Sequence, residues 1–163
     1  MLLACIIAGF IFMEGFSWAF HKYIMHGPLW HIHKSHHLPS NGPLEANDIF
    51  SLCFGSIAAA LIFFGFRSAN FPMAGFGLGI TAYGMVYFVL HDLGVHNRIK
   101  NSFLSRATFF ARIKRAHKIH HKSLSKMPSS SFGLLFVAPS VFKTKAAPQP
   151  GSSSPCHNPS ISA

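Results

Sequence analysis

HKYIMHGPLWHIHKSHH, residues 21–37, joins an H-x-x-x-x-H pair to an H-x-x-H-H triplet. Both spacings return later in the chain, the pair as His91 and His96 and the triplet within residues 117–121. Ten of the twelve histidines belong to these four clusters. Since an α-helix turns about 100° per residue, the members of each triplet lie within an arc of about 100° and can face one point.

Converging imidazoles are typical of a metal site, because imidazole is the commonest protein ligand and binds without adding charge. A tetrahedral ion takes about four ligands and an octahedral ion about six, so this many imidazoles predict two metals in one cavity, with positions left open. A run of solvated or core histidines is the alternative, but two triplets that each follow a spaced pair form a specific pattern. The predicted ligands are His21, His26, His33, His36, His37, His91, His96, His117, His120 and His121.

The five-residue pairs do not fit a regular helix. His21 and His26 would lie about 140° apart around the axis and about 7.5 Å apart along it, too far to chelate one ion readily. Either a π-bulge or a helix end brings the two together, or they bind different metals. Two histidines are not predicted ligands, because His31 points away from its triplet and His157 lies near the C-terminus.

The composition is that of a membrane protein, with 50% hydrophobic and 11% charged residues. Three apolar segments, residues 1–20, 49–66 and 71–90, are each about long enough to cross a hydrocarbon core of about 30 Å as a helix. The first lacks the basic start and cleavage site of a signal peptide, so we expect it to be retained. We expect an all-α integral membrane protein with three or four transmembrane helices and additional surface helices. The membrane domain should cover residues 1–143, followed by a disordered Pro- and Ser-rich tail over residues 144–163.

Three successive crossings would bring all four histidine clusters to the same side of the membrane. Thirteen of the fourteen lysines and arginines fall on that side as well, and only Arg67 lies in the short opposite loop. Because positive residues mark the cytoplasmic side of a membrane protein, we expect the histidine site at the cytoplasmic face.

The net charge of +10 suits an acidic partner. Anionic lipid headgroups are the favoured partner, because the basic residues flank membrane spans. An acidic electron-carrier protein could dock on the same surface, along an amphipathic stretch over residues 98–126. Nucleic acid is not expected, because no soluble module remains to bind it. The candidate docking residues are Arg98, Lys100, Arg112, Lys114 and Arg115.

Few polar side chains are available to support the predicted ligands. Ligating imidazoles commonly donate their other N–H to a carboxylate or carbonyl, which makes Asn47, Asp48 and Asp92 candidates for this role. Asp48 and Glu45 could instead mark a helix N-terminus, where acidic side chains complement the helix dipole. Glu14 precedes the first histidine by about two turns on nearly the same helix face. It either lines the cavity or supports a ligand, unless it lies in water at the opposite interface.

A small-residue pattern marks the third apolar segment. Gly75 and Gly79 form a G-x-x-x-G motif, which lets two membrane helices approach closely, so helix packing is the expected role. A slim apolar substrate could instead lie against this face, in a pocket lined by Phe76, Tyr83 and Tyr87.

Several enzyme classes are excluded by what the sequence lacks. It has neither the E-x-x-H motif of soluble di-iron bundles nor the H-E-x-x-H motif of zinc peptidases. It also lacks a phosphate-binding loop and a G-x-G-x-x-G dinucleotide fingerprint. A redox-active metal pair that faces an apolar substrate remains, and dioxygen activation by two irons suits such a pair.

A family resemblance is carried by the blocks MEGFSWAFHKYIMHG, WHIHKSHH, LEANDIF, GITAYGMVYFVLHD and RAHKIHH. Their histidine spacings resemble the integral-membrane fatty acid hydroxylase superfamily of di-iron enzymes. Over roughly residues 13–137 the blocks are similar to bacterial-type β-carotene 3-hydroxylases. The ten predicted ligands match the ligand histidines of that family.

The resemblance implies two irons, molecular oxygen, and electrons relayed from NAD(P)H through a ferredoxin-like carrier. Zinc could replace iron in a purified sample. The implied reaction is hydroxylation of carotenoid β-ionone rings at C3, from β-carotene through β-cryptoxanthin to zeaxanthin. A hydroxylase, desaturase or ketolase of a sterol or fatty acyl lipid is the alternative. A membrane metal-binding or transport protein is less favoured, because its ligands would lie within the spans or in a flexible loop. The oligomeric state stays open.

Overall fold

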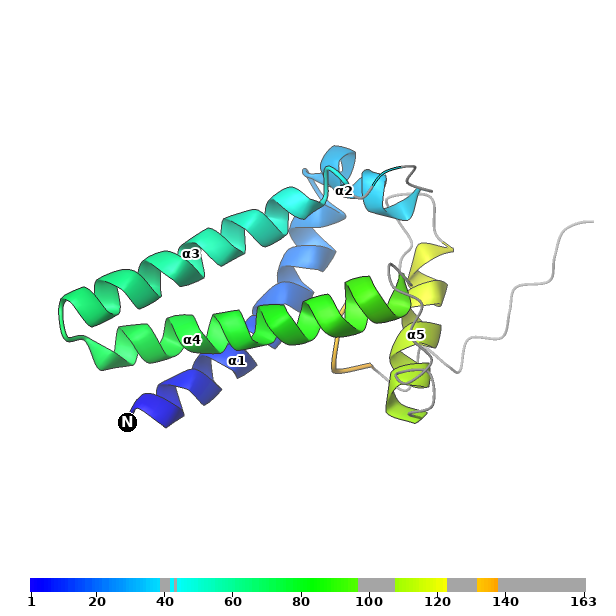
Figure 1. The fold of residues 1–163 in the computed structure, drawn as a ribbon. Helices are drawn as coiled ribbons and strands as arrows, with labels where there is room; N and C mark the ends of the chain where they lie inside the picture. Colours follow the sequence, from blue (N-terminus) through cyan, green and yellow to red (C-terminus); the bar gives the residue numbers. More distant parts are fainter. Residues whose placement is uncertain (39–41, 43, 97–107, 123–131, 138–163) are drawn as a thin grey trace, which may run out of the picture.

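The computed structural model describes residues 1–38, 42, 44–96, 108–122 and 132–137. Within these ranges the regular elements are all helices, as predicted (Figure 1). Two of them are π-helices, η1 and η2, and each continues a long α-helix without a break. In chain order the elements are α1 (Leu2–Ala19), η1 (Phe20–Met25), α2 (Trp30–His37), α3 (Asp48–Arg67), α4 (Phe71–Tyr87), η2 (Phe88–Val95) and α5 (Thr108–His121).

Three helical rods are long and apolar enough to cross a membrane, namely Leu2–Met25, Asp48–Arg67 and Phe71–Val95. They coincide with the three predicted spans. The first and third end at Met25 and Val95 rather than at residues 20 and 90, because the histidine-bearing ends continue as η1 and η2. Large apolar side chains such as Ile11 and Phe63 are exposed on the outside of these rods, which suits contact with lipid.

Glycines allow α4 to pack closely against both of its neighbours. A Cβ added at Gly79 would overlap the backbone of α1, and one added at Gly75 would lie 2.9 Å from Cys5 Cβ in the same helix. On the side of α3, a Cβ at Gly77 would lie 2.9 Å from Leu61 Cβ. The predicted packing role of the G-x-x-x-G motif is therefore confirmed, and its partner is α1.

The histidine-bearing elements gather at one end of the molecule (Figure 1). There α5 packs on η2 and α2 packs on η1, whereas the N-terminus and the turn between α3 and α4 lie at the opposite end. Arg67, predicted for the opposite side, ends α3 at that turn. The predicted basic stretch over residues 98–126 is described only between residues 108 and 122, and the predicted tail over 144–163 lies outside the described residues.

A buried apolar cluster joins the spanning helices to α5 and to the short segment 132–137. Its members come from α1, α3, α4, η2, α5 and that segment, so α5 is fixed against the membrane-length helices by hydrophobic burial. The cluster consists of Met13, Ala58, Ile80, Tyr83, Val95, Phe110, Ile113 and Leu134.

Candidate metal centre

The π-helices resolve the five-residue histidine spacing. In η1 the backbone N–H of His26 donates to the carbonyl oxygen of His21 at 3.0 Å, and in η2 the N–H of His96 donates to that of His91 at 3.0 Å. An i→i−5 bond of this kind widens the turn, so that the second residue of each pair comes back over the first. Of the two arrangements left open by the sequence, the π-bulge is the one present.

The two triplets lie on the short helices, as their spacing predicts. His33, His36 and His37 on α2 are all buried, and on α5 His120 is completely buried. The excluded residue His31 is exposed. Each short helix therefore turns its histidine triplet inward, toward the ends of the spanning helices.

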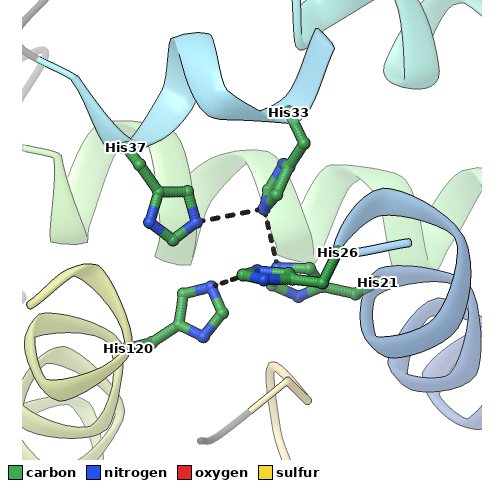
Figure 2. Close-up of side chains that lie close together, drawn as sticks. All are labelled: His21, His26, His33, His37 and His120. Atoms are coloured by element: carbon green, nitrogen blue, oxygen red, sulfur yellow. Dashed lines mark hydrogen bonds between the residues drawn. The ribbon is translucent and has the colours of Figure 1, made fainter. Parts of the chain in front are cut away.

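Nine of the ten predicted ligands form two groups. Within each group, one nitrogen from every ring lies within 4.8 Å of the others. Figure 2 shows the first group, in which rings from η1, α2, α5 and the residue after η1 point toward one another. The first group consists of His21, His26, His33, His37 and His120. The second group consists of His36, His91, His96 and His117.

The spacing between ring nitrogens is that of ligands around a common ion. His33 Nε2 lies 3.0 Å from His21 Nε2 and 3.2 Å from His37 Nε2, and in the second group His96 Nε2 lies 3.1 Å from His117 Nε2. With metal–nitrogen bonds of about 2.1 Å, adjacent ligands of an octahedral or tetrahedral ion lie about 3.0–3.4 Å apart. These three contacts therefore match the spacing of adjacent ligands around such an ion.

The outward nitrogens of the first group fix which ring nitrogens face inward. His21 Nδ1 donates to the carbonyl oxygen of Phe132 at 3.0 Å, and His33 Nδ1 donates to Asn47 Oδ1 at 2.7 Å. A neutral ring that donates from Nδ1 keeps a lone pair on Nε2. With both Nδ1–H groups donating outward, the two inward Nε2 atoms, 3.0 Å apart, are available as acceptors, an arrangement that suits a shared cation.

The outward nitrogens of the second group also donate to oxygen acceptors, which here are carboxylates. His36 Nδ1 donates to Glu45 Oε2 at 2.9 Å, and His91 Nδ1 donates to Asp92 Oδ1 at 3.1 Å. Carboxylates that orient a histidine in this way also raise its basicity as a ligand.

His121, the tenth predicted ligand, lies between the two groups. Its ring is 4.6 Å from the ring of His37 in the first group and 4.3 Å from that of His117 in the second. His121 Nε2 is buried and has no hydrogen-bond partner among the described residues. Such a nitrogen is costly to bury, and coordination of a metal ion would satisfy it.

Burial lowers the pKa of three histidines that lie outside the membrane-length helices, namely His33, His117 and His121. The pKa of His33 falls to about 3, mainly through burial, and the hydrogen bond to Asn47 only partly opposes this. Burial likewise lowers the pKa of His121 to about 2 and that of His117 well below its usual value, and neighbouring rings add to both shifts. These rings are neutral near pH 7 and can bind metal without first losing a proton.

The predicted supporting residues divide into two sets. Asn47 and Asp92 hydrogen-bond to histidines, as described above. Asp48 instead accepts a hydrogen bond from the backbone N–H of Glu45 at 2.9 Å, and so steadies the loop that carries the Glu45 carboxylate. Glu14 accepts hydrogen bonds from Tyr83 and from the backbone of residues 135 and 136 rather than from a ligand ring.

Two oxygen acceptors were missed by the sequence analysis. Glu45 was assigned only to a helix N-terminus, although an acidic residue shortly after the first triplet was the available signal. The carbonyl oxygen of Phe132 has no side-chain signature, so no pattern in the sequence could indicate it.

The three candidate pocket residues lie at different depths along α4. The ring of Tyr87 stacks on His91 with a centroid distance of 4.4 Å, so it touches the second group. Tyr83 is buried and lies 6.5 Å from Tyr87. Phe76 packs on Phe12 of α1, about 16 Å along the axis from Tyr87.

Three membrane-length helices with two adjacent histidine groups at one end define a membrane metalloprotein. A family model described as fatty acid hydroxylase matches residues 6–144, and the chain belongs to this family. The predicted family resemblance is therefore confirmed.

Individual relatives point in the same direction. A "Beta-carotene hydroxylase" from Pseudescherichia vulneris is 38% identical over 81% of this chain and 74% of its own length. Another, from Pantoea ananas, is 39% identical over 78% of this chain and 72% of its own length. The plant protein "Beta-carotene hydroxylase 1, chloroplastic" from Capsicum annuum is 40% identical over 75% of this chain and 38% of its own length. No solved structure matches the chain.

Proposed function

We propose that this protein is a di-iron, O2-dependent monooxygenase that hydroxylates carotenoid β-ionone rings at C3, and so converts β-carotene through β-cryptoxanthin into zeaxanthin. The observation that carries the proposal is the similarity to bacterial proteins described as β-carotene hydroxylases, which extends over most of both chains. The two adjacent groups of neutral nitrogen donors support it, because such donors suit iron.

The histidines divide naturally between two irons. The first group of five would hold one iron, and the second group of four, joined by His121, would hold the other. Five nitrogen donors leave one position open on an octahedral ion. When bound, a pair of irons with open positions supplies the activation of dioxygen that an unactivated ring carbon requires.

The protein's own residues orient the ligands and exclude water. Phe132 packs its ring on His21 at a centroid distance of 5.4 Å, and Tyr87 covers His91 on the other side at 4.4 Å. Aromatic walls of this kind keep bulk water away from the reacting atoms and so limit side reactions.

The carotenoid would enter from the bilayer, where it dissolves. Tyr87 lies against the second histidine group, and Tyr83 and Phe76 continue along α4 away from it. A long polyene with its terminal ring at the irons would lie along this direction, so we propose that these three residues line its path. The membrane domain would cover residues 1–143, with the metal centre at the cytoplasmic face.

Electrons would arrive through α5. Its buried side carries His120 and its exposed side carries Arg112, Arg115 and Lys118, which lie within an arc of about 120°. An acidic ferredoxin-type carrier, itself reduced by NAD(P)H, would dock on this basic face, one helix diameter from the ligands. Of the other three predicted docking residues, Lys114 is half-buried and lies outside this arc, and Arg98 and Lys100 lie outside the described residues.

Expression in a bacterium that already accumulates β-carotene tests the proposal. Chromatography of the extracted pigments should show singly and doubly hydroxylated β-rings. Untouched β-carotene, in cells with well-expressed, iron-loaded protein and a working electron donor, would instead favour another lipid substrate.

A ligand variant provides the control for that experiment. His120→Ala should abolish the conversion, because His120 belongs to the first group, with its Nε2 3.2 Å from that of His26, and is completely buried. His31→Ala changes an exposed histidine on the neighbouring helix and should leave the conversion unchanged. Retained activity in His120→Ala would remove that residue from the ligand set.

A further inference from the structure

Glu14, within α1, binds a stretch of backbone from much later in the chain. Its Oε1 accepts hydrogen bonds from the N–H of Leu135 at 3.0 Å and from the N–H of Phe136 at 2.9 Å. Its Oε2 accepts a hydrogen bond from the hydroxyl of Tyr83 in α4 at 2.9 Å. One carboxylate therefore joins α1, α4 and the segment 132–137.

The other end of the same segment lies on the first histidine group. The carbonyl oxygen of Phe132 accepts the Nδ1–H of His21, and the Phe132 ring lies 5.2 Å from the ring of His26 and 5.4 Å from that of His120. Between the two ends, Leu134 is buried in the apolar core. The segment thus runs as one connected strap from the carboxylate of Glu14 to the histidines.

A non-helical segment in this position needs acceptors for its backbone N–H groups. Beside an apolar, membrane-length helix, a backbone N–H left without an acceptor is costly. Glu14 satisfies two of them with a single oxygen. The close approach is visible at Gly133, where an added Cβ would lie 3.3 Å from Glu14 Oε1 and 2.9 Å from Phe136 O.

We propose that Glu14 is a positioning residue for the first iron: it clamps the segment 132–137 so that the carbonyl of Phe132 holds His21 with Nε2 directed at the ion. The inference rests on the proposed function, since it takes the first histidine group as an iron site. The second group takes its oxygen acceptors from Glu45 and Asp92 instead, so the clamp acts on one of the two irons.

Glu14→Ala tests the clamp, because it removes all three hydrogen bonds. Removal of a partner behind a metal ligand costs roughly 10- to 100-fold in metal affinity, and we expect about 10-fold for the first iron, since Glu14 acts through Phe132. The second iron should bind as in the wild type. Titration of the metal-free protein with ferrous iron, followed by Mössbauer spectroscopy, separates the two environments. Amide hydrogen exchange at Leu135 and Phe136 should also become faster without metal present.

Two further variants serve as matched controls. Glu14→Gln keeps an amide oxygen that can accept both backbone N–H groups, so it should fall between Glu14→Ala and the wild type. Phe136→Ala changes an exposed side chain but keeps the donating N–H, so its iron binding should equal that of the wild type.

The outcomes separate the clamp from simpler explanations. Parallel loss of both irons in Glu14→Ala would overturn the proposal and indicate a general structural role, and unchanged affinity for both would overturn it as well. A wild-type protein that binds no iron at all would refute the proposed function, while hydrogen exchange at Leu135 would still report whether the clamp exists.

Discussion

At the level of single residues, His33 shows how the direction of one ring is determined. Its Nδ1 is committed to Asn47 Oδ1 at 2.7 Å, so its Nε2 must face His21 and His37 at 3.0 and 3.2 Å. Glu45 does the same for His36 in the other group. Each histidine group is thus oriented by oxygen acceptors that lie behind its rings.

Removal of these acceptors should therefore act selectively. Asn47→Ala should weaken iron binding by the first group roughly 10- to 100-fold, because His33 loses the partner that directs its Nε2 inward. Glu45→Ala should weaken the second group to a similar extent through His36. Iron titration monitored by Mössbauer spectroscopy measures both affinities, and loss of the same iron in both variants would contradict this division.

Acid should destabilise the metal-free protein. The pKa of His33 is about 3 in the folded chain, and an unfolded histidine titrates near its ordinary value of 6.5. Between these values the unfolded chain binds a proton that the folded chain does not, so the free energy of unfolding falls as the pH falls from 6.5 toward 3. One such group contributes a slope of up to about 1.4 kcal/mol per pH unit. His121, with a pKa of about 2, adds a second contribution.

Denaturant unfolding of the chelator-treated protein in detergent, repeated across this pH range, measures the effect. His33→Gln removes one titrating ring, so its stability should depend less steeply on pH than that of the wild type. A free energy of unfolding that stays constant between about pH 6.5 and 4.5 would show that these rings are not buried in their neutral form.

The site residues that could be predicted from the sequence are those whose side chains can bind a metal and recur at a fixed spacing, or can accept a hydrogen bond. The ten histidines were recognisable because two spacings each occur twice, and Asn47 and Asp92 because few other polar groups lie nearby. The acceptor for His21 was beyond prediction, since it is a backbone carbonyl 111 residues further along the chain. Such a contact depends on the packing of distant segments, which no local pattern encodes.

At the level of elements, the π-helices are the feature that periodicity alone could not decide. On a regular helix the two side chains of an H-x-x-x-x-H pair would point in different directions. The widened π-turn in η1 and η2 brings the two side chains of each pair together instead. The apolar segments predicted the rods correctly, because burial in lipid requires only length and hydropathy. Length and hydropathy do not distinguish an α-turn from a π-turn.

Close packing of α1 on α4 should be sensitive to a single methyl group. Gly79→Ala would place a Cβ into the backbone of α1, so the two helices must separate and the protein should lose roughly 1–3 kcal/mol of stability. Gly84→Ala is the matched control on the same helix, because its Cβ would meet nothing within 4 Å. Alanine favours a helix over glycine by up to about 1 kcal/mol, so this control should be neutral or slightly stabilising.

Thermal unfolding of the two variants in the same detergent compares them directly. A midpoint for Gly79→Ala equal to or above that of Gly84→Ala would contradict the backbone contact between α1 and α4.

At the level of the whole molecule, the spanning helices and the short helices α2 and α5 supply different parts of the histidine site. The first and third rods end in η1 and η2 and bring four histidines to one end, and the short helices α2 and α5 carry the other six. In the proposed function, α5 would be the element through which a carrier in solution reaches the metal centre, because it has histidines on its buried side and basic residues on its exposed side.

Charge reversal on α5 tests this assignment. The triple variant Arg112→Glu, Arg115→Glu and Lys118→Glu should raise the KM for a reduced acidic ferredoxin roughly 10-fold or more, since like charges then oppose docking. Turnover of the wild type should fall with added salt for the same reason. With a small chemical reductant in place of the carrier, kcat and iron content should match those of the wild type, because no ligand has changed.

A charge at the other end of the molecule separates docking from a general effect of charge. Arg67→Glu reverses an exposed charge at the turn between α3 and α4, far from the histidines, and should leave the KM for ferredoxin unchanged. If the basic face of α5 instead meets anionic lipid, the triple variant would keep its KM and lose only its preference for vesicles that contain anionic lipids. A triple variant that is equally impaired with the chemical reductant would place the defect in the metal centre, since neither docking nor lipid binding is needed for that assay.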